Sequence, residues 1–311
     1  MKAIALDEYG DADVLRLRDL PDPAVGPDVV RIRVRAAGIN PVDYKIRQGY
    51  LQGAFPHHTP LIPGWDVAGV VDAVGPAVTR FAVGDEVMAY ARKDSVQHGT
   101  YAELVGVAEP AVAAKPASLD FVRAGGLPLA GLTAFQALTA VDVGPGDVVL
   151  VHAAAGGVGH LAVQLARALG AARVIGTASS ANHDFLRGLG CEPIEYGDDL
   201  PDRLAKLVGG DGRVDAALDF VGGTALSQSP AMVRAAARHA SVVDPQVKEQ
   251  GGRYVFVRPN GAQLESLGAL ADAGRLRVEV AREFPLAEAA QAQRLLEQGH
   301  VRGKVVLTVD H

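Results

Sequence analysis

The chain has 311 residues, of which 49% are hydrophobic and 21% are charged. These fractions are typical of folded proteins and exclude a disordered or fibrous chain, and at roughly 150 residues per domain the length suggests about two domains. The 30 basic and 36 acidic residues are well mixed along the sequence and leave a net charge of -6, which argues against nucleic acid as a partner.

Cysteine usage and hydropathy indicate the compartment. Cys191 is the only cysteine of the sequence, which excludes an internal disulfide and a multi-cysteine zinc site and favours a reducing compartment. No run of 18 apolar residues occurs, and the apolar start Met1–Leu6 is too short for a signal peptide. We therefore expect a cytoplasmic protein without a membrane-spanning segment.

Residues 1 to about 115 are expected to form short strands. Val30–Arg35 alternates apolar and cationic side chains with the period of a half-exposed strand. Two further apolar runs, Val67–Val74 and Glu86–Ala89, are bounded by glycine-containing turns. This part of the chain is therefore predicted to be mainly β.

The pattern changes near residues 115–118, where we expect a domain junction. Residues 128–141 carry apolar side chains at helical spacing, and residues 147 to about 257 alternate β-rich runs with helical stretches, which is typical of a parallel sheet. Helices near 261–273 and 286–298 and a last strand are expected after it. The predicted strands of these regions are Val148–Val151, Arg173–Gly176, Ala216–Asp219, Ala240–Val243 and Val305–Leu307.

A glycine turn follows the strand that ends at Val151. The sequence Ala153-Ala154-Ala155-Gly156-Gly157-Val158-Gly159 leads into a stretch with apolar residues at helical spacing. Small residues let the backbone approach a pyrophosphate closely, and a helix N-terminus offers free N–H groups to it. The turn therefore predicts a dinucleotide site; the alternative is a helix start that merely contains glycines.

The end of the next strand bears on the choice between NAD and NADP. An acidic residue about 20 residues after the glycine turn would accept from a ribose hydroxyl and repel a 2′-phosphate. The chain instead has hydroxyl and amide side chains in Thr177–His183, which favours NADP. Ser180 could also simply cap the following helix, and the two interpretations are compatible.

A series of motifs resembles a known family. The motifs are Gly38–Lys45, Pro63–Gly69, Gly99–Glu103, Gly131–Ala134, the glycine turn, Asp219–Gly223 and Gly299–Leu307. In this order they resemble the zinc-independent branch of the medium-chain dehydrogenase/reductase superfamily that contains quinone oxidoreductases (zeta-crystallin-like) and enone reductases. The resemblance implies an α/β protein: a GroES-like, partly open β-barrel catalytic domain at 1–118, completed by 259–311, and a Rossmann domain with a doubly wound parallel sheet at 119–258.

Two departures from zinc-dependent relatives argue against a metal. Those relatives have Cys where Asn40 stands and His where Trp65 stands, and neither residue here is a good zinc ligand. The adjacent pair His57-His58 lacks a matching carboxylate motif, and neighbouring side chains of a strand point in opposite directions. We therefore expect no metal site.

The resemblance also implies which residues hold the cofactor, expected to be NADPH. It places Ser179, Ser180 and Tyr196 around the adenosine 2′-phosphate, and Thr133 with a Phe256–Val257 strand near the pyrophosphate or nicotinamide. Asp219 ends a strand at the edge where such sheets bind ligands, although a structural role in the turn is an equal alternative. The turn and the resemblance together assign to the cofactor Ala153, Gly156, Gly157, Val158, Gly159, Ser179, Ser180, Tyr196, Thr133, Asp219, Phe256, Val257 and Lys304.

One departure concerns the 2′-phosphate. Relatives often have Arg or Lys where Ala181 stands, so that the phosphate grip is expected to be weaker here or to come from His183 or Arg187.

Hydride transfer to a conjugated carbonyl places negative charge on its oxygen, which then needs a hydrogen-bond donor. Lys45 and Tyr50 can donate, Asn40 can orient, and Asp43 can hold Lys45 or anchor the loop. In related enone reductases the lysine of this motif lies near the nicotinamide, which implies a catalytic role for Lys45. The alternative is that Asp43, Lys45 and Arg47 form a solvated charged face.

We therefore predict an NADPH-dependent, metal-independent oxidoreductase that transfers hydride to a quinone or an α,β-unsaturated carbonyl compound. Tyr50, Phe55 and Trp65 predict a mostly apolar substrate pocket. Alternatives are a specialised biosynthetic enoyl or ketone reductase and a noncatalytic NADPH-binding protein with a sensory or structural task. Relatives pair through the edge of the Rossmann sheet, which implies a homodimer with Ala240–Val243 and Tyr254–Val257 as edge strands.

Overall fold

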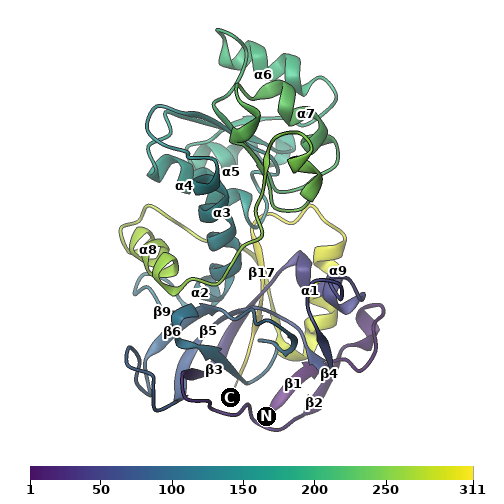
Figure 1. Cartoon of the computed structure of the whole chain (residues 1–311), viewed down its shortest axis with the longest axis vertical. Coiled ribbons are helices and arrows are strands. Elements are labelled where there is room, and N and C mark those ends of the chain that lie inside the picture. The colour runs from purple at the N-terminus through teal and green to yellow at the C-terminus, as the bar shows by residue number, and fades with distance from the viewer. Residues whose placement is uncertain (311) are drawn as a thin grey trace. The chain divides into compact units, whose positions relative to one another are not determined.

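A computed structural model describes residues 1–310, which form two compact units (Figure 1). The first unit contains Met1–Leu132, Arg258–Gly274 and the chain from Val278 onward, and the second contains Thr133–Val257 with Arg275–Arg277. The first limit therefore lies later than the junction expected at residue 118. The reason is helix α2 (Phe121–Gly126), which packs against strands of the first unit.

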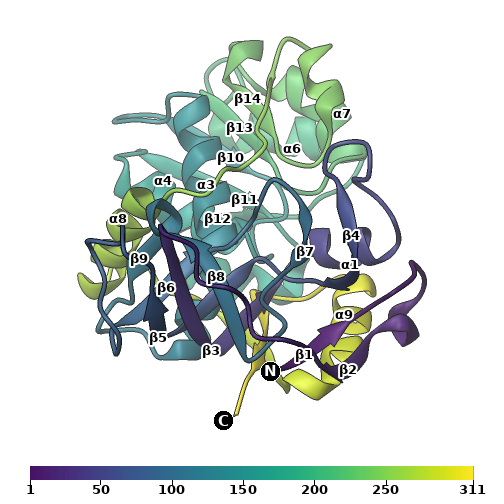
Figure 2. The same ribbon diagram turned by 60° about the horizontal axis from the view of Figure 1, so that its bottom comes forward.

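A seven-stranded sheet forms the body of the first unit (Figure 2). Its order is β16-β17-β3-β5-β6-β9, and β8 pairs with β3 outside this path. The strands are β3 (Val29–Ile39), β5 (Asp66–Val74), β6 (Glu86–Tyr90), β8 (Leu104–Ala108), β9 (Val112–Ala114), β16 (Val280–Pro285) and β17 (Lys304–Thr308).

Strand β3 shows why this sheet forms. Val30, Ile32 and Val34 are fully buried, whereas Arg33 and Arg35 between and beyond them are exposed, as the alternation in the sequence predicts. The strand pairs antiparallel with β5, β8 and β17. It therefore joins the N-terminal part of the unit to the last strand of the chain.

Smaller elements complete the first unit. Two-stranded sheets form from β1 (Lys2–Ala5) with β2 (Arg16–Asp19) and from β4 (His57–Ile62) with β7 (Val96–His98). The helices are α1 (Pro41–Arg47), α2, α8 (Gly261–Asp272) and α9 (Ala289–Glu297), and α3 (Pro128–Ala140) begins in this unit and continues into the second.

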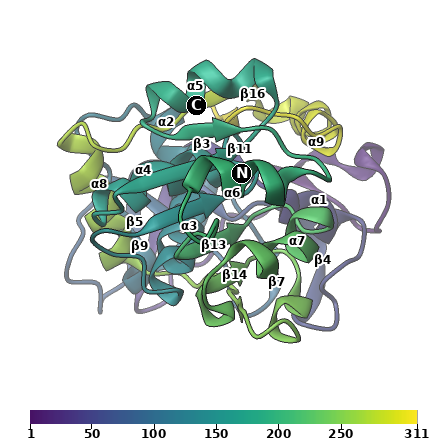
Figure 3. The same cartoon turned by 90° about the horizontal axis from the view of Figure 1, so that it is seen from above.

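The second unit is built on a six-stranded parallel sheet (Figure 3). Its order, β12-β11-β10-β13-β14-β15, corresponds to 3-2-1-4-5-6 within the unit, which is the order of a Rossmann domain. The strands are β10 (Val148–Val151), β11 (Arg173–Thr177), β12 (Glu192–Ile194), β13 (Ala216–Asp219), β14 (His239–Ser241) and β15 (Arg253–Tyr254). The helices are α4 (Gly159–Ala168), α5 (His183–Gly188), α6 (Leu200–Val208) and α7 (Thr224–Met232).

Two expectations about the last strands are wrong. Strand β14 lies between β13 and β15 and is therefore not an edge strand, because β15 pairs along its other side. Strand β15 is the edge strand, but it ends at Tyr254, so Phe256 and Val257 follow the strand and are not part of it.

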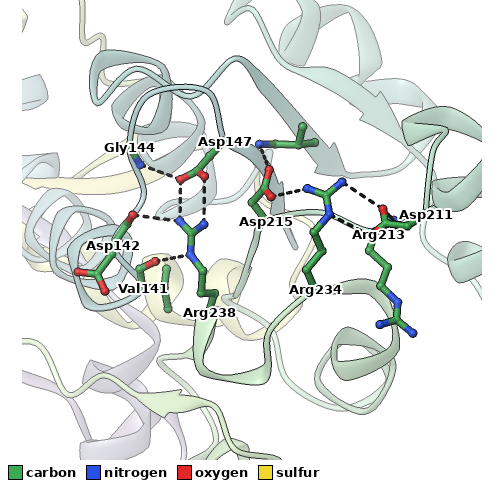
Figure 4. A network of polar contacts seen from close by, with 10 residues as sticks. Val141, Asp142, Gly144, Asp147, Asp211, Arg213, Asp215, Arg234 and Arg238 are labelled. Atoms are coloured by element: carbon green, nitrogen blue, oxygen red, sulfur yellow. Dashed lines mark hydrogen bonds and ion pairs between the residues drawn. The ribbon is translucent and has the colours of Figure 1, made fainter.

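Ion pairs join the loops at the amino-terminal edge of this sheet (Figure 4). The guanidinium of Arg238 donates to both carboxylate oxygens of Asp147, just before β10, and to the carbonyls of Val141 and Asp142. Arg234 pairs in the same way with Asp211 and Asp215. These contacts lie at the opposite edge from the glycine turn, which follows the carboxyl end of β10.

No helix within residues 1–310 combines the length and the apolar character needed to span a lipid bilayer.

Candidate functional site

The glycine turn in the second unit has no room for larger side chains. Ala153 has a positive φ of 52°, and a Cβ on Gly159 would lie 2.2 Å from the Ala153 carbonyl oxygen. Thr177 at the end of β11 holds the start of the turn: its hydroxyl accepts from the Ala153 N–H at 3.1 Å and its carbonyl from the Ala154 N–H at 2.9 Å. The hydroxyl of Thr177 therefore serves as an acceptor that holds the turn, and the side chain is buried.

The turn leaves backbone donors available. Within residues 1–310, the N–H groups of Gly157 and Val158 donate to no protein acceptor, and both residues are only half-buried. Helix α4 begins at Gly159 directly after them, so its positive dipole end lies at the same place. Free amides, a helix N-terminus and a close backbone approach are the features that a diphosphate requires. The residues of the turn therefore fit a dinucleotide.

The predicted adenosine phosphate residues gather at one edge of the sheet. Ser179 and Ser180 follow β11, and Tyr196 follows β12, its parallel neighbour. Ser180 and Tyr196 are exposed, and Ser179 is half-buried and accepts a hydrogen bond from Asn182. Neighbouring strands thus bring two exposed hydroxyls to the position where an NADP phosphate is expected.

The two side chains considered as substitutes for a phosphate-binding Arg or Lys differ in exposure, since Arg187 is exposed and His183 is half-buried. Arg187 pairs with Asp184 at 2.7 Å. The Nε2 atom of His183 is buried. A phosphate bound beside Arg187 would therefore compete with Asp184 for its guanidinium.

Asp219 holds the turn after β13. Its Oδ1 accepts from the N–H groups of Val221 and Gly222, and its Oδ2 accepts from the Ser241 hydroxyl at 2.7 Å. The carboxylate is fully buried. The geometry therefore favours the structural alternative for Asp219 over direct contact with a cofactor.

Exposed apolar side chains follow three neighbouring strands at this same carboxyl edge. Val221, Val243 and Phe256 come after β13, β14 and β15, respectively, and all three are substantially exposed. Val257 is half-buried beside Phe256, and Thr133 is buried in α3. The carboxyl edge of this sheet thus has polar backbone groups at the glycine turn and exposed apolar side chains after β13, β14 and β15. Such side chains can contact a planar ring.

A buried polar cluster lies in the first unit. The side chain of Asn40 donates to Asp66 at 2.9 Å and accepts from the Lys304 ammonium at 2.5 Å. Asp66 also accepts from the Leu129 N–H at 2.6 Å and lies 3.5 Å from Lys304. Burial raises the pKa of Asp66 and lowers that of Lys304, and the charge of each partner opposes the shift of the other.

This cluster corrects the expectation for Lys304. Its side chain is 3% exposed, and its ammonium contacts three oxygens, those of Ile39, Asn40 and Asp66. An ammonium has three donors, and here protein atoms occupy them. Lys304 therefore stabilises the first unit and does not offer its charge to a dinucleotide.

Asp43 anchors the start of helix α1. Its Oδ2 accepts from the Asn40 N–H and from the Tyr101 hydroxyl, each at 2.8 Å, whereas its buried Oδ1 has no hydrogen-bond partner. Burial is the main cause that raises the pKa of Asp43 to about 7. Of the two roles expected for Asp43, the geometry supports anchoring, because the carboxyl contacts Tyr101 and not Lys45.

Lys45 and Tyr50 are both exposed. The Lys45 ammonium makes no hydrogen bond or ion pair with any residue from 1 to 310 and is therefore available to a ligand. The alternative of a solvated charged face is wrong, because Asp43 and Arg47 are almost completely buried. Arg47 instead donates to the Gly10 carbonyl and to Gln293 and Glu297 of α9.

The residues at the zinc-ligand positions do not fit a metal. Both side-chain atoms of Asn40 are engaged with Asp66 and Lys304, and the cationic ammonium beside it would repel a metal ion. Trp65 is buried, with its ring edge-on to Phe55 at 6.2 Å and to Tyr90 at 6.0 Å. Residues 1–310 contain no group of three or more His, Cys, Asp or Glu side chains arranged to hold a metal.

Asp66 and Tyr101 are the residues that sequence reasoning missed. Asp66 stands beside Trp65, and Tyr101 stands within Gly99–Glu103. Both lie in motifs that carry the family resemblance, and this position was the one indication in the sequence of a functional role. Their roles depend on contacts with α1 and β17, which no local pattern reveals.

Comparison with known proteins agrees with this geometry. Residues 26–117 match the model of the alcohol dehydrogenase GroES-like domain, and residues 192–307 match that of zinc-binding dehydrogenase. The chain is 37% identical to the chloroplastic NADPH-dependent alkenal/one oxidoreductase of Arabidopsis thaliana, over 99% of this chain and 79% of that protein. It is 35% identical to the 2-haloacrylate reductase of a Burkholderia species, over 98% of each.

Among solved structures, the quinone oxidoreductase from Coxiella burnetii is similar with a TM-score of 0.88 and 39% identity, over 100% of this chain and 99% of that one. The strand order of the second unit, the glycine turn and these full-length similarities agree. The chain belongs to the medium-chain dehydrogenase/reductase superfamily, in its branch of quinone oxidoreductases and enone reductases.

Proposed function

We propose that this protein transfers hydride from NADPH to a quinone or an α,β-unsaturated carbonyl compound without the help of a metal. The observation that carries the proposal is the glycine turn, whose Gly157 and Val158 amides are free beside the N-terminus of α4. The relatives named above include a reductase of alkenals and enones that uses NADPH and a quinone oxidoreductase.

NADPH supplies the hydride when it is bound. The amides of Gly157 and Val158 hold its pyrophosphate, and Ala153, Gly156 and Gly159 supply the small side chains that permit this approach. Ser179, Ser180 and Tyr196 hold the adenosine phosphate by donating from their hydroxyl groups.

The first unit supplies the donors for the substrate. Negative charge gathers on the substrate oxygen during reduction, and the exposed Lys45 ammonium and Tyr50 hydroxyl can donate to it. Asn40 and Asp43 act indirectly, because they hold the start of the helix that carries Lys45. Phe55 and Trp65 supply an apolar contact for a flat conjugated carbonyl.

A metal is unnecessary in this proposal. An ammonium at Lys45 gives the developing oxyanion the stabilisation that a Lewis acid gives in metal enzymes. The side chains of Asn40 and Trp65 do not form a zinc ligand set.

We further propose a cytoplasmic homodimer that pairs through β15. The sheet edge at Arg253–Tyr254 is supported by its position at the end of the strand order, since an edge strand has unpaired backbone groups. The single cysteine, Cys191, is buried and suits a reducing compartment. Light scattering after size-exclusion chromatography tests the dimer, and a monomer at micromolar concentration contradicts it.

The test of function is a cofactor-consumption assay. NADPH and NADH are compared in parallel over quinones, enones, saturated aldehydes and secondary alcohols, with and without a chelator. The expected result is chelator-insensitive oxidation of NADPH with quinones or enones. Preference for NADH would overturn the phosphate assignment, and chelator-sensitive alcohol oxidation would overturn the metal-free mechanism. Tight NADPH binding without turnover on any substrate would favour the noncatalytic alternative.

A further inference from the structure

Four cationic or titratable basic side chains gather on the first unit, around the paired strands β4 and β7. Arg92 and Lys93 precede β7, His98 ends it, and His58 lies on β4, with which β7 pairs. We call these four residues the basic cluster. The mechanism proposed above uses none of them.

For three members of the cluster, the described residues offer no acidic partner. Lys93, His58 and His98 make no ion pair with a carboxylate of residues 1–310. Asp94 stands next to Lys93 in the chain but is exposed and pairs with neither it nor the two histidines. Burial alone lowers the pKa of Lys93 to about 8, and burial together with Lys93 and His58 lowers the pKa of His98. A half-buried ammonium without a counter-ion costs free energy that a bound anion would recover.

The Lys93 ammonium has N–H groups that donate to no atom of residues 1–310. Its ammonium donates to the His98 carbonyl oxygen at 2.9 Å, and no described residue accepts from its remaining two N–H groups. Two N–H donors on one ammonium match the oxygens of a carboxylate, and such charge-assisted bonds are stronger than neutral ones.

The cluster adjoins the aromatic residues proposed for the substrate. The Arg92 guanidinium lies 5.4 Å from the centre of the Phe55 ring, and Phe55 is edge-on to Trp65. Lys93 is the next residue after Arg92. A flat conjugated group against Phe55 therefore lies beside the Arg92 guanidinium, one residue before Lys93.

We infer that Lys93, with His58 and His98, forms a subsite for the carboxylate of an unsaturated substrate, so that carboxylate-bearing enones are the preferred substrates. This inference rests on the proposed function, because it names the substrate class of that same site. A neutral quinone leaves the Lys93 ammonium without a counter-ion, whereas a carboxylate supplies one.

The experiment compares an acid with its own ester. 4-Oxopent-2-enoate and its methyl ester share the conjugated ketone and differ in charge. The ratio of kcat/KM for the acid over kcat/KM for the ester is measured in the wild type, in Lys93→Gln and in Lys93→Arg. Lys206→Gln, at an exposed lysine of α6 in the second unit, is the matched control.

In Lys93→Gln the ratio should fall by at least about tenfold, because KM for the acid rises. Lys93→Arg should keep most of the wild-type ratio, and Lys206→Gln should keep all of it. High salt should lower the wild-type ratio. A ratio that changes by less than about twofold in Lys93→Gln, or an equal loss on both substrates, overturns the inference and leaves the proposed function standing.

A binding measurement tests the subsite even if the protein does not turn over these substrates. If the wild type reduces neither compound, calorimetric titration with 4-oxopent-2-enoate still tests the subsite. Binding of the acid but not the ester, lost in Lys93→Gln, supports it, and no binding of the acid overturns it.

Discussion

Lys304 donates to the side-chain oxygen of Asn40 across 264 positions of sequence, at 2.5 Å. The same ammonium lies 3.5 Å from Asp66, whose other oxygen accepts from the Leu129 N–H. One buried ion pair therefore joins the last strand of the chain to the loop before α1 and to the start of α3. The candidate catalytic helix depends on residues that are remote in sequence.

Replacing Lys304 should destabilise the protein strongly. Lys304→Met removes the ammonium and leaves Asp66 as a buried carboxylate without a cation, which costs about 3–5 kcal/mol. Urea unfolding followed by circular dichroism measures the loss. The double variant Lys304→Met, Asp66→Asn removes both charges and should recover at least half of it. A double variant no more stable than the single one would contradict the ion-pair explanation.

Replacing Asp43 by Asn should change how stability depends on pH. The pKa of Asp43 is about 7 in the folded protein and 3.8 as its ordinary value, so between these pH values the folded state binds more protons than the unfolded state. The contribution of Asp43 to stability therefore falls as pH rises from about 4 to about 7.

Asp43→Asn removes this loss and keeps an oxygen for the Asn40 N–H and the Tyr101 hydroxyl. The free energy of unfolding of Asp43→Asn minus that of the wild type should rise between pH 4 and pH 7. Subtraction also removes the opposite trend of His152, whose pKa is lowered to about 4, mainly by burial. Asp198→Asn, at an exposed carboxylate, is the matched control. A flat difference for Asp43→Asn would contradict the assignment.

Removing the Lys45 ammonium should slow the reaction without weakening cofactor binding. Lys45→Ala is expected to lower kcat by more than about tenfold, the low end of acid–base and donor contributions. The Kd for NADPH should change little, because the proposed cofactor residues lie on the other unit. Steady-state kinetics and a fluorescence titration separate the two effects. Unchanged turnover on a good substrate would remove Lys45 from the mechanism, and Lys206→Ala is the control for loss of a surface lysine.

Adding one methyl group to the glycine turn should weaken NADPH binding. In Gly159→Ala the new Cβ would meet the Ala153 carbonyl oxygen at 2.2 Å, so the turn must shift. A loss of about 1.4 kcal/mol or more, which is a tenfold rise in Kd, is expected by calorimetry. Gly53→Ala is the matched control, because a Cβ there meets nothing within 4 Å. Equal affinity of Gly159→Ala and the wild type would show that the turn does not hold the cofactor.

Local patterns predicted the parts of the structure that depend on neighbouring residues. The strands β10 and β13 have the predicted bounds, and the glycine turn occupies the predicted place between β10 and α4. Strand periodicity and small-residue turns are properties of a few consecutive residues, and the sequence displays them directly.

The parts that sequence reasoning missed depend on distant partners. Lys304 stands in a motif of the family, and only its contacts with Asn40 and Asp66 reveal that its charge is already neutralised. For Asp219, two roles were considered, and the hydrogen bond from the Ser241 hydroxyl on the next strand favours the structural one. Such pairings decide between a structural and a ligand-binding role, and composition and spacing do not contain them.

The position of β17 also has a consequence for synthesis on the ribosome. In strand β3, one edge of Ala36–Ile39 stays unpaired until residues 304–308 have been synthesised, whereas residues 133–257 of the second unit form a nearly continuous stretch. The parallel sheet of the second unit can therefore form before residues 304–308 have been synthesised, whereas the seven-stranded sheet of the first unit is incomplete until then. During that interval the unpaired edge of β3 can pair with another chain, which favours aggregation.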